Sequence, residues 1–327
     1  MLWVTSVSHN QIMTLTQLSA FVLVARLGSV KAAASALGVS EPAVSQALAS
    51  LRKYLDDPLL TRSGGGMAMT PGGSRLLTIA AQMVSLGAEA ESAVRSAQGA
   101  AEQLRLVAPS TIVEFVAGPL ADAFTARSAG SIEVSAGVSA TAEMAVLVSQ
   151  RLADVAVGPY LGADRSLGLV SEPIFRCRLV VLAAPDARLR GAPPQWPWLV
   201  EPGATDPGSD VSRLLRGLGV PESRLSVFPN QTAAWEAAGR GGGVAPGIAH
   251  LAVHRLRRRE LQVVDVPGTP MELCWHATTP PVDRRSVAAA SMRHFLGTPE
   301  AMKLLRSPGA GVPPSRFRPP VYVTIWS

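Results

Sequence analysis

The sequence predicts a mixed fold, with an all-α N-terminal domain, one long helix and a two-lobed α/β domain. Residues 13–73 carry short amphipathic helix patterns, and residues 74–102 carry one long helical pattern. Residues 103–306 alternate strand and helix patterns, which is typical of parallel βαβ units. A proline-rich segment follows, residues 307–327, and is expected to form an extended tail.

Composition and charge limit the partners before any motif is considered. The 327 residues have a formal net charge of +6 and a pI near 10.0, which suits a polyanionic partner. Two cysteines, Cys177 and Cys274, are too few for a disulfide framework and favour a reduced compartment. No apolar run reaches the roughly 18–20 residues that span a bilayer, and the N-terminus lacks a secretion signal. We therefore expect a cytoplasmic protein with no membrane partner.

Stop and cap signals divide the first domain into helices. Residues 15–27 have helical apolar spacing, and Gly28 ends that helix. Ser29 can cap a second helix, residues 30–37, and Ser40 can cap a third. Two helices joined by so short a turn are typical of a helix-turn-helix motif, although an ordinary helical hairpin in a core has the same pattern.

The third helix separates an apolar stripe from a polar outer face. The stripe comprises Val44, Ala47, Leu48, Leu51 and Leu55. The outer face carries the short polar side chains of Ser40, Ser45, Gln46 and Ser50. Short polar side chains suit a helix that enters a DNA major groove about 12 Å wide. This face favours DNA reading over the plain hairpin.

Two short strands with a glycine-rich turn are expected after the third helix. Leu59-Leu60 and Met67–Met69 can pair across Gly64–Gly66. Such a hairpin, or wing, lies along the phosphate backbone, where Arg62 and Thr70 would be ligands that position the protein. A flexible loop is the alternative for the three glycines.

A longer pattern runs through residues 15–73. It has an aromatic residue in the first helix, then Ser-x-x-x-Ala-Ala-x-x-Leu, Ser-x-Pro-Ala-x-Ser, Pro-Leu-x-x-Arg and Thr-x-x-Gly. Its members are Phe21, Ser29, Ala33, Ala34, Leu37, Ser40, Pro42, Ala43, Ser45, Pro58, Leu59, Arg62, Thr70 and Gly73. This long, almost gap-free pattern resembles the winged helix-turn-helix of LysR-type transcriptional regulators.

The chain departs from that family at a few positions. Glu41 stands where the family usually has Gln, and Leu60 stands where it has Phe. Gln46 and Ala47 replace an Arg-Gln or Lys-Gln pair. A carboxylate can accept a hydrogen bond from cytosine N4 but repels phosphate, so Glu41 is expected to give an unusual base preference.

The resemblance implies a sequence-specific regulator that binds double-stranded promoter or operator DNA as a homodimer or homotetramer. The predicted DNA-binding residues are Lys31, Ser40, Glu41, Pro42, Ser45, Gln46, Ser50, Arg52, Lys53, Arg62, Thr70 and Arg75. Basic residues only modestly outnumber acidic ones between residues 14 and 75. We therefore expect one domain to bind DNA weakly and affinity to come from dimerisation.

The long helical pattern has a broad apolar face. Its members are Leu76, Leu77, Ile79, Ala80, Met83, Val84, Leu86 and Val94. Three short helices and a wing cannot bury all of them, so part of the face should meet another chain. The resemblance makes residues 74–102 the linker helix that pairs two DNA-binding domains. Packing against the chain's own C-terminal domain is the alternative.

The C-terminal pattern predicts two α/β lobes joined by two crossing segments, as in periplasmic-binding-protein-like clamps. Lobe I comprises about residues 103–175 and 277–306, and lobe II about residues 176–276. One helix, from Ser286 to Arg306, is expected to close lobe I. By resemblance this is the family's effector-binding domain.

Polar residues follow the predicted strands at the points where helices begin. They are Ser110, Thr111, Ser139, Thr141, Asn230, Gln231 and Thr232. Helix N-termini at the carboxyl ends of strands present free N–H groups to ligands, so these residues predict a cleft for a small carboxylate or other polar effector. Simple helix capping is the alternative for each of them.

No assembled set of acid, base, nucleophile or metal ligands appears, so we expect neither an enzyme nor a metal or other cofactor. The arginines of residues 255–259 are interpreted as a solvated helix end. Two hypotheses remain: a DNA-binding regulator modulated by a metabolite, and a small-molecule-binding or transport-type protein whose N-terminal helices serve assembly only. The effector, the target promoters and activation or repression are not encoded in recognisable residues.

Overall fold

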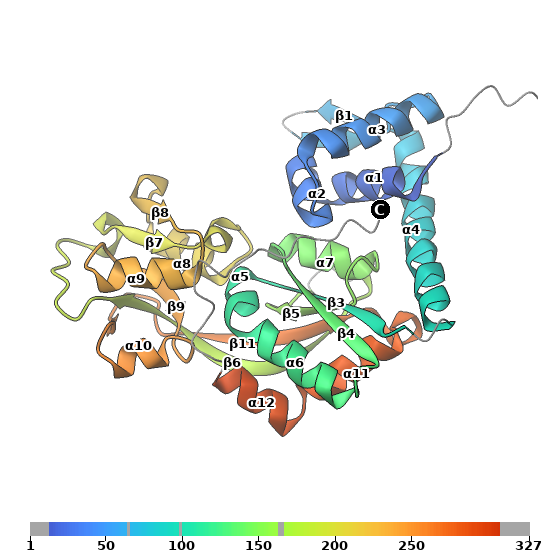
Figure 1. Ribbon diagram of the computed structural model, residues 1–327. Coiled ribbons are helices and arrows are strands. Elements are labelled where there is room, and N and C mark those ends of the chain that lie inside the picture. Colours follow the sequence, from blue (N-terminus) through green and yellow to red (C-terminus); the bar gives the residue numbers. More distant parts are fainter. Residues whose placement is uncertain (1–12, 64–65, 98–99, 163–166, 308–327) are drawn as a thin grey trace, which may run out of the picture. The chain divides into compact units, whose positions relative to one another are not determined.

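The computed structural model describes residues 13–63, 66–97, 100–162 and 167–307 (Figure 1). The chain divides into two compact units, with the boundary between Glu91 and Ser92. In the described ranges, no helix is both long and apolar enough to cross a membrane.

Three helices build the first unit: α1 (Leu15–Leu27), α2 (Val30–Leu37) and α3 (Glu41–Leu55). Each begins after a capping residue, Thr14, Ser29 or Ser40, whose hydroxyl accepts a hydrogen bond from a first-turn N–H. α1 and α2 end at Gly28 and Gly38, whose φ angles of 67° and 65° are left-handed. The predicted helices and caps are confirmed.

The predicted stripe of α3 forms the centre of this unit. Val44, Leu48 and Leu51 are buried, and α3 packs on both α1 and α2. Phe21 of α1 is fully buried in the same unit. Because the stripe faces inward, the polar side of α3 is left facing outward.

An antiparallel hairpin follows, with strands β1 (Leu60–Ser63) and β2 (Gly66–Met69). The first strand begins one residue later than predicted, because Leu59 has a left-handed φ of 58°. The N–H of Leu59 donates to Asp57 Oδ1 at 2.6 Å instead of joining the strand ladder. Residues 64–65 of the predicted turn lie outside the described residues.

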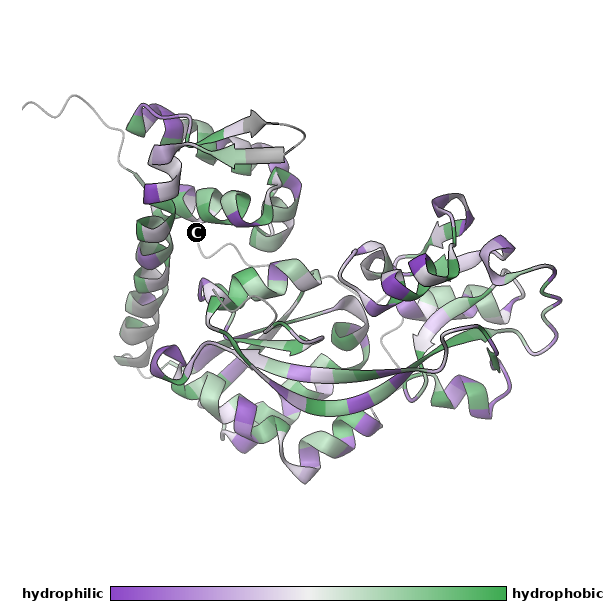
Figure 2. Cartoon of the chain, turned by 180° about the vertical axis from the view of Figure 1, so that it is seen from behind, coloured by the Kyte–Doolittle hydropathy of each residue, from purple (hydrophilic) through white to green (hydrophobic). Residues whose placement is uncertain are grey.

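Helix α4 (Pro71–Ala97) starts against the wing and ends earlier than the predicted limit of residue 102. Gly73 permits this close start, since a Cβ on it would lie 2.2 Å from the carbonyl oxygen of Leu59. Hydrophobic residues run along much of α4 (Figure 2). Leu77, Ala80 and Val84 are buried, whereas Ile79, Met83, Leu86 and Val94 are exposed.

A sheet in the order β10-β6-β11-β5-β3-β4 forms the base of the second unit. Its strands are β3 (Glu102–Ala108), β4 (Ile132–Val138), β5 (Val155–Gly158), β6 (Val170–Ala183), β10 (Gln262–Val264) and β11 (Met271–Thr279). β3 pairs in parallel with β4 and β5, as the βαβ pattern predicted. The long strands β6 and β11 pair antiparallel and are the two predicted crossing segments between the lobes.

Helices cover lobe I on both sides of this sheet (Figure 1). One connection runs as α5 (Ser110–Ile112), the π-helical turn η1 (Val113–Ala117) and α6 (Gly118–Arg127). The others are α7 (Thr141–Ser149), the turn η6 (Val282–Arg284), α11 (Val287–Leu296) and α12 (Pro299–Arg306).

The prediction of one helix from Ser286 to Arg306 was wrong. Thr298 has extended backbone and accepts a hydrogen bond from Ala301 N, so a new helix starts there. Pro299 takes the first helical position and disfavours helical backbone at the residue before it.

Lobe II is a second α/β unit. Its strands are β7 (Trp198–Val200), β8 (Leu225–Val227) and β9 (Ala245–Ile248), and its helices are α8 (Asp210–Leu218), α9 (Gln231–Gly239) and α10 (Val253–Arg257). The short turns η3 (Pro193–Gln195), η4 (Pro202–Thr205) and η5 (Glu222–Arg224) connect them. β7 and β8 are parallel, and β9 joins β6 of the main sheet. The strand ends of the two lobes hold the residues of the predicted cleft.

Candidate nucleic-acid interface and ligand cleft

The outward side of α3 presents most of the predicted reading residues to solvent. The exposed residues are Ser40, Glu41, Pro42, Ser45 and Gln46. Ser50 is half-buried. Glu41 lies in the first turn of α3, where its negative charge complements the helix dipole. This face is polar, built from short side chains and supported by a buried apolar stripe.

Cations flank this face on neighbouring elements. Lys31 on α2, Lys53 near the end of α3 and Arg75 on α4 are exposed. Arg52 differs because it is half-buried, and its Nη2 lies 3.5 Å from the carbonyl oxygen of Leu60 in the wing. Arg52 therefore holds the wing against α3 in addition to carrying charge.

Thr70 is already engaged within the protein. Its hydroxyl donates to Asp57 Oδ1 at 2.8 Å and accepts from Gly73 N at 2.9 Å. Asp57 also accepts from the N–H of Leu59, so it fixes the base of the wing. Arg62 lies on β1, but its side chain is outside the described residues.

A buried carboxylate joins the two lobes at the start of α9. Glu114 of lobe I accepts from the N–H groups of Gln231 and Thr232, at 2.9 and 3.0 Å. Only 3 % of Glu114 is exposed. The pair of bonds fills the N-terminus of α9, the position where a helix binds an anion. The protein thus places its own carboxylate where the sequence suggested an effector.

Two further contacts join the lobes. The hydroxyl of Ser110 donates to Glu201, which also accepts from Gly203 N at 2.7 Å. The N–H of Thr141 donates to Asp206 Oδ2 at 2.8 Å, at the start of α7. Together with Glu114, these carboxylates connect lobe I to lobe II through hydrogen bonds.

The remaining predicted cleft residues act within their own lobes. Asn230 caps α9 by accepting from Ala233 N at 2.8 Å. Ser139 is buried and donates to Glu143 Oε2 at 3.1 Å. Thr111 is half-buried on α5. The structure therefore brings Ser110, Thr141, Gln231 and Thr232 to the lobe contacts. It gives Asn230 a capping bond and Ser139 a hydrogen bond to the side chain of Glu143.

The expectation of free N–H groups at these helix starts was wrong for Thr141, Gln231 and Thr232. Sequence reasoning missed the three acidic residues, Glu114, Glu201 and Asp206. Their signal was present, since each lies within about five residues of a predicted strand end. It was not used because their partners are distant in the chain.

Burial in the cleft raises the pKa of two of its carboxyl groups. Burial raises the pKa of Glu114, opposed by hydrogen bonds from Thr232 and Gln231. Burial also raises the pKa of Glu201, opposed by bonds from Ser110 and Gly203 and reinforced by the charges of Glu114 and Asp206. Among the described residues, no three acidic, histidine or cysteine side chains could hold a metal ion.

Comparison with known proteins identifies the domains in which these two candidate sites lie. Residues 15–74 match the family described as "Bacterial regulatory helix-turn-helix protein, lysR family", and residues 97–298 match the "LysR substrate binding domain". The chain belongs to the LysR family. It is a transcriptional regulator with a helix-turn-helix DNA-binding domain and an effector-binding domain, and the family is regulatory.

Relatives of this LysR-family chain cover nearly its whole length. It is 35 % identical over 325 residues to the uncharacterized HTH-type transcriptional regulator Rv0377 of Mycobacterium tuberculosis, which covers 96 % of this chain and 100 % of that protein. It is 28 % identical to CfxR of Cupriavidus necator, over 94 % of this chain and 99 % of that protein. ArgP from Mycobacterium tuberculosis has the same fold, with a TM-score of 0.52, 21 % identity and coverage of 86 % and 95 %.

Proposed function

We propose that this regulator binds operator DNA as a homo-oligomer, reads bases through the outward face of α3, and responds to a small polar metabolite in the interlobe cleft. The observation that carries the proposal is the exposed polar face of α3 beside the wing. DNA as partner is consistent with the cytoplasmic location expected from the sequence. No catalytic role is proposed.

The residues divide into base-reading and positioning groups. Gln46, Ser45 and Glu41 are exposed on α3 and reach outward, so they suit contacts with base edges. Lys31 and Arg75 are exposed on adjacent elements and suit phosphates. Thr70 and Arg52 support these contacts by holding the wing, since both are bonded to it or to its base.

The exposed apolar stripe of α4 supports association of two chains. Ile79, Met83, Leu86 and Val94 are each exposed and lie at spacings close to whole helical turns. A second α4 packed against this stripe would remove them from water. A dimer and a tetramer both satisfy this feature, and pairing would double the number of DNA-reading faces.

The effector would act by exchanging the lobe contacts. Glu114, Glu201 and Asp206 already bind the donors of the cleft, so a carboxylate effector must displace one of them. An effector that carries hydrogen-bond donors could instead bind to these acidic groups. Either exchange changes the contacts that hold the lobes together and thereby the geometry of the oligomer.

Selection of binding sites from random DNA duplexes tests the DNA-reading face. We expect two related half-sites at a spacing of about one helical turn or a multiple of it. Gln46→Ala should weaken binding of the selected site about 10- to 100-fold, whereas Gln103→Ala, an exposed glutamine of β3, should not. Arg75→Ala should weaken all sequences and lower the salt dependence by about one counterion.

Absence of salt-sensitive DNA binding, or binding that Gln46→Ala leaves unchanged, would refute this function and favour the small-molecule-binding alternative. Leu86→Glu tests association separately, and sedimentation should then show a monomer. A thermal-shift screen of metabolites tests the cleft, since a ligand at 100 times its Kd stabilises by about 2.7 kcal/mol. A full shift in Ser110→Ala would argue against effector contact there.

A further inference from the structure

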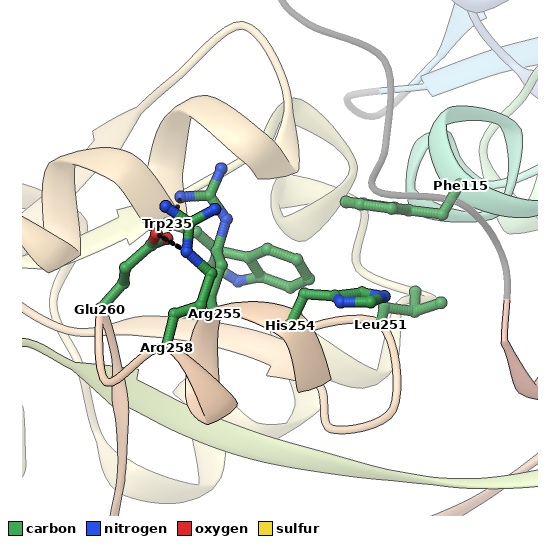
Figure 3. A pocket seen from close by; sticks show the side chains of 7 residues that line it. All are labelled: Phe115, Trp235, Leu251, His254, Arg255, Arg258 and Glu260. Carbon is green, nitrogen blue, oxygen red and sulfur yellow. Dashed lines mark ion pairs between the residues drawn. The ribbon is translucent and has the colours of Figure 1, made fainter.

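Lobe II has a surface on which arginines outnumber acidic residues. Arg240 follows α9 as its C-cap, while Arg255, Arg258 and Arg259 lie in the last turn of α10 or directly after it. We call these four residues the arginine face. Two adjoining cavities, of about 120 and 290 Å³, both have Arg255 and Glu260 in their walls, and the other three arginines line one or the other. Figure 3 shows the side chains of Arg255 and Arg258 converging on Glu260.

Two glutamates pair with these arginines without covering them. Glu236 lies 3.4 Å from Arg255 Nη2 and 3.9 Å from Arg240 Nη2, and Glu260 lies 2.9 Å from Arg258 Nε. The side chains of the two glutamates are 39 % and 37 % exposed, whereas those of Arg240 and Arg258 are 81 % and 77 % exposed. A molecule that approaches this surface therefore meets guanidinium groups before it meets carboxylates.

Arg259 occupies a backbone position that favours glycine. α10 ends in a Schellman motif, in which the N–H of Arg259 donates to Leu256 O at 3.1 Å and the N–H of Glu260 donates to Arg255 O at 2.9 Å. The φ of Arg259 is 55°, which is left-handed, and a glycine takes the left-handed position at the ends of α1, α2 and α8. Arg259 is exposed and forms no ion pair with any described residue. Its charge is thus available to a partner, at a position where stability alone favours glycine.

The chemistry of this surface fits the phosphate backbone of DNA. Residues 14–75 hold only six basic residues against three acidic ones, although they contain the DNA-binding domain. The arginine face holds four basic residues against two acidic ones, so its excess of positive charge is close to that of the whole first domain. Guanidinium groups form charge-assisted hydrogen bonds with phosphates whatever the base sequence. A DNA-binding regulator with so few cations in its reading domain gains affinity from a second basic surface.

We propose that the arginine face is a second DNA contact, which binds phosphates outside the half-sites that α3 reads. The inference rests on the proposed DNA-binding function and adds a sequence-independent contact to it. Arg258, Arg259 and Arg240 bind phosphates, whereas Arg255 is mostly buried, with 24 % of its side chain exposed, and holds the two glutamates in place. Residues 255–259 are therefore more than the solvated helix end that the sequence predicted.

Binding of the full chain to two fluorescent duplexes tests the proposal. The short duplex ends at the selected half-sites, and the long duplex carries about 30 further base pairs of unrelated sequence, or three helical turns, on each side. We expect the long duplex to bind about tenfold more tightly at low salt, with a difference that shrinks as salt rises. Hydroxyl-radical footprinting of the long duplex should show protected phosphates in the flanks as well as in the half-sites.

Single substitutions assign the flanking contact to residues. Arg258→Gln and Arg259→Gly should each lower the affinity for the long duplex several-fold and its salt dependence by about one counterion per chain, with the short duplex unaffected. Arg259→Gly should leave the calorimetric transition of the second unit unchanged or higher, because glycine fits the left-handed backbone. Arg257→Gln is the matched control, since it removes the same charge from an exposed position of the same helix that lines neither cavity.

The possible failures of the inference and of the proposed function are distinct. Binding to neither duplex would refute the proposed DNA-binding function and this inference with it. Equal affinities of the wild type for both duplexes would overturn the inference alone. So would an equal effect of Arg257→Gln and Arg258→Gln, which would assign the effect to net charge. Flank protection that persists in both Arg258→Gln and Arg259→Gly, or an equal loss of affinity for both duplexes in Arg259→Gly, would also overturn it.

Discussion

The two candidate sites differ in what their polar groups already bind. On α3, the outward residues are exposed and meet water, while the helix beneath them is fixed by Ser40 and a buried stripe. In the cleft, Ser110, Thr141 and the start of α9 already bind acidic groups of the opposite lobe. The polar groups of an exposed face can be hydrogen-bonded to water when no DNA is bound. Buried polar groups in the cleft need partners within the protein, so the effector that we propose would have to replace one of these partners.

The largest effect is expected for a substitution that disrupts the contact between α4 and the base of the wing. In Gly73→Ala, the new Cβ would lie 2.2 Å from the carbonyl oxygen of Leu59. Backbone cannot yield as a flexible side chain can, so we expect a loss of about 3 kcal/mol in the unfolding free energy of the first unit. Differential scanning calorimetry should show one transition moving down and the other staying in place.

Gly217→Ala is the matched control for that change. Gly217 lies inside α8, and a Cβ there would meet nothing within 4 Å. Replacing it with Ala should stabilise the second unit by about 0.5–1 kcal/mol. An unchanged first transition in Gly73→Ala would show that the wing does not depend on this contact.

A pair of glutamates compares the two sites directly. Glu114→Ala leaves two buried N–H groups of α9 without an acceptor, which should cost about 2 kcal/mol. Glu41→Ala removes only an exposed charge from the first turn of α3 and should cost about 0.5 kcal/mol or less. Urea unfolding of both variants measures the difference.

We expect the two substitutions to affect different functions. Glu41→Ala should change the preferred DNA sequence while leaving the lobes closed. Glu114→Ala should loosen the lobes, seen as faster amide hydrogen exchange at α9, with base preference unchanged. Equal stability losses in the two variants would contradict the distinction between an open face and a self-occupied cleft.

Much of the first unit could be predicted because its signals are local. Ser29 and Ser40 cap helices through residues three positions away, and Gly28 and Gly38 stop helices through their own backbone. The start of each wing strand was predicted to within one residue, whereas β1 runs three residues beyond its predicted end at Leu60. The later start of β1 came from Asp57, whose side chain accepts the hydrogen bond of the Leu59 N–H and so keeps Leu59 out of the strand. An aspartate before a proline does not by itself predict that bond.

The cleft could be predicted only as a location. Strand ends and helix starts placed Ser110, Thr141 and Gln231 correctly at the lobe contacts. The bond from Gln231 to Glu114 spans 117 positions, and no local pattern encodes such a pairing. The break at Thr298 was readable in principle, because a Thr-Pro pair is a cap signal that the apolar pattern of the last helix obscured.

An effect smaller than those of Gly73→Ala and Glu114→Ala distinguishes the two units by their response to acid. His250 packs against Phe175 and Trp275, with ring centroids 5.0 and 5.5 Å away, and burial lowers its pKa to about 4 from 6.5. The unfolded chain therefore binds a proton that the folded chain refuses, and stability falls as pH falls from about 6.5 to 4. The described part of the first unit contains no histidine, so its transition lacks this contribution.

His250→Phe keeps a ring in this packing and removes the titration. Between pH 6.5 and 4 the unfolding free energy of both proteins falls. Because the histidine is partly exposed, we expect the fall to be only about 1 kcal/mol smaller in His250→Phe than in the wild type. The raised pKa values of Glu114 and Glu201 act in the opposite direction, since their stability contribution is lost as pH rises. These two contributions are the same in the wild type and in His250→Phe, so they cancel when the pH profiles of the two proteins are compared. His254→Phe, at an exposed position, should retain the wild-type profile, and if it flattened equally the effect would belong to surface charge and not to burial.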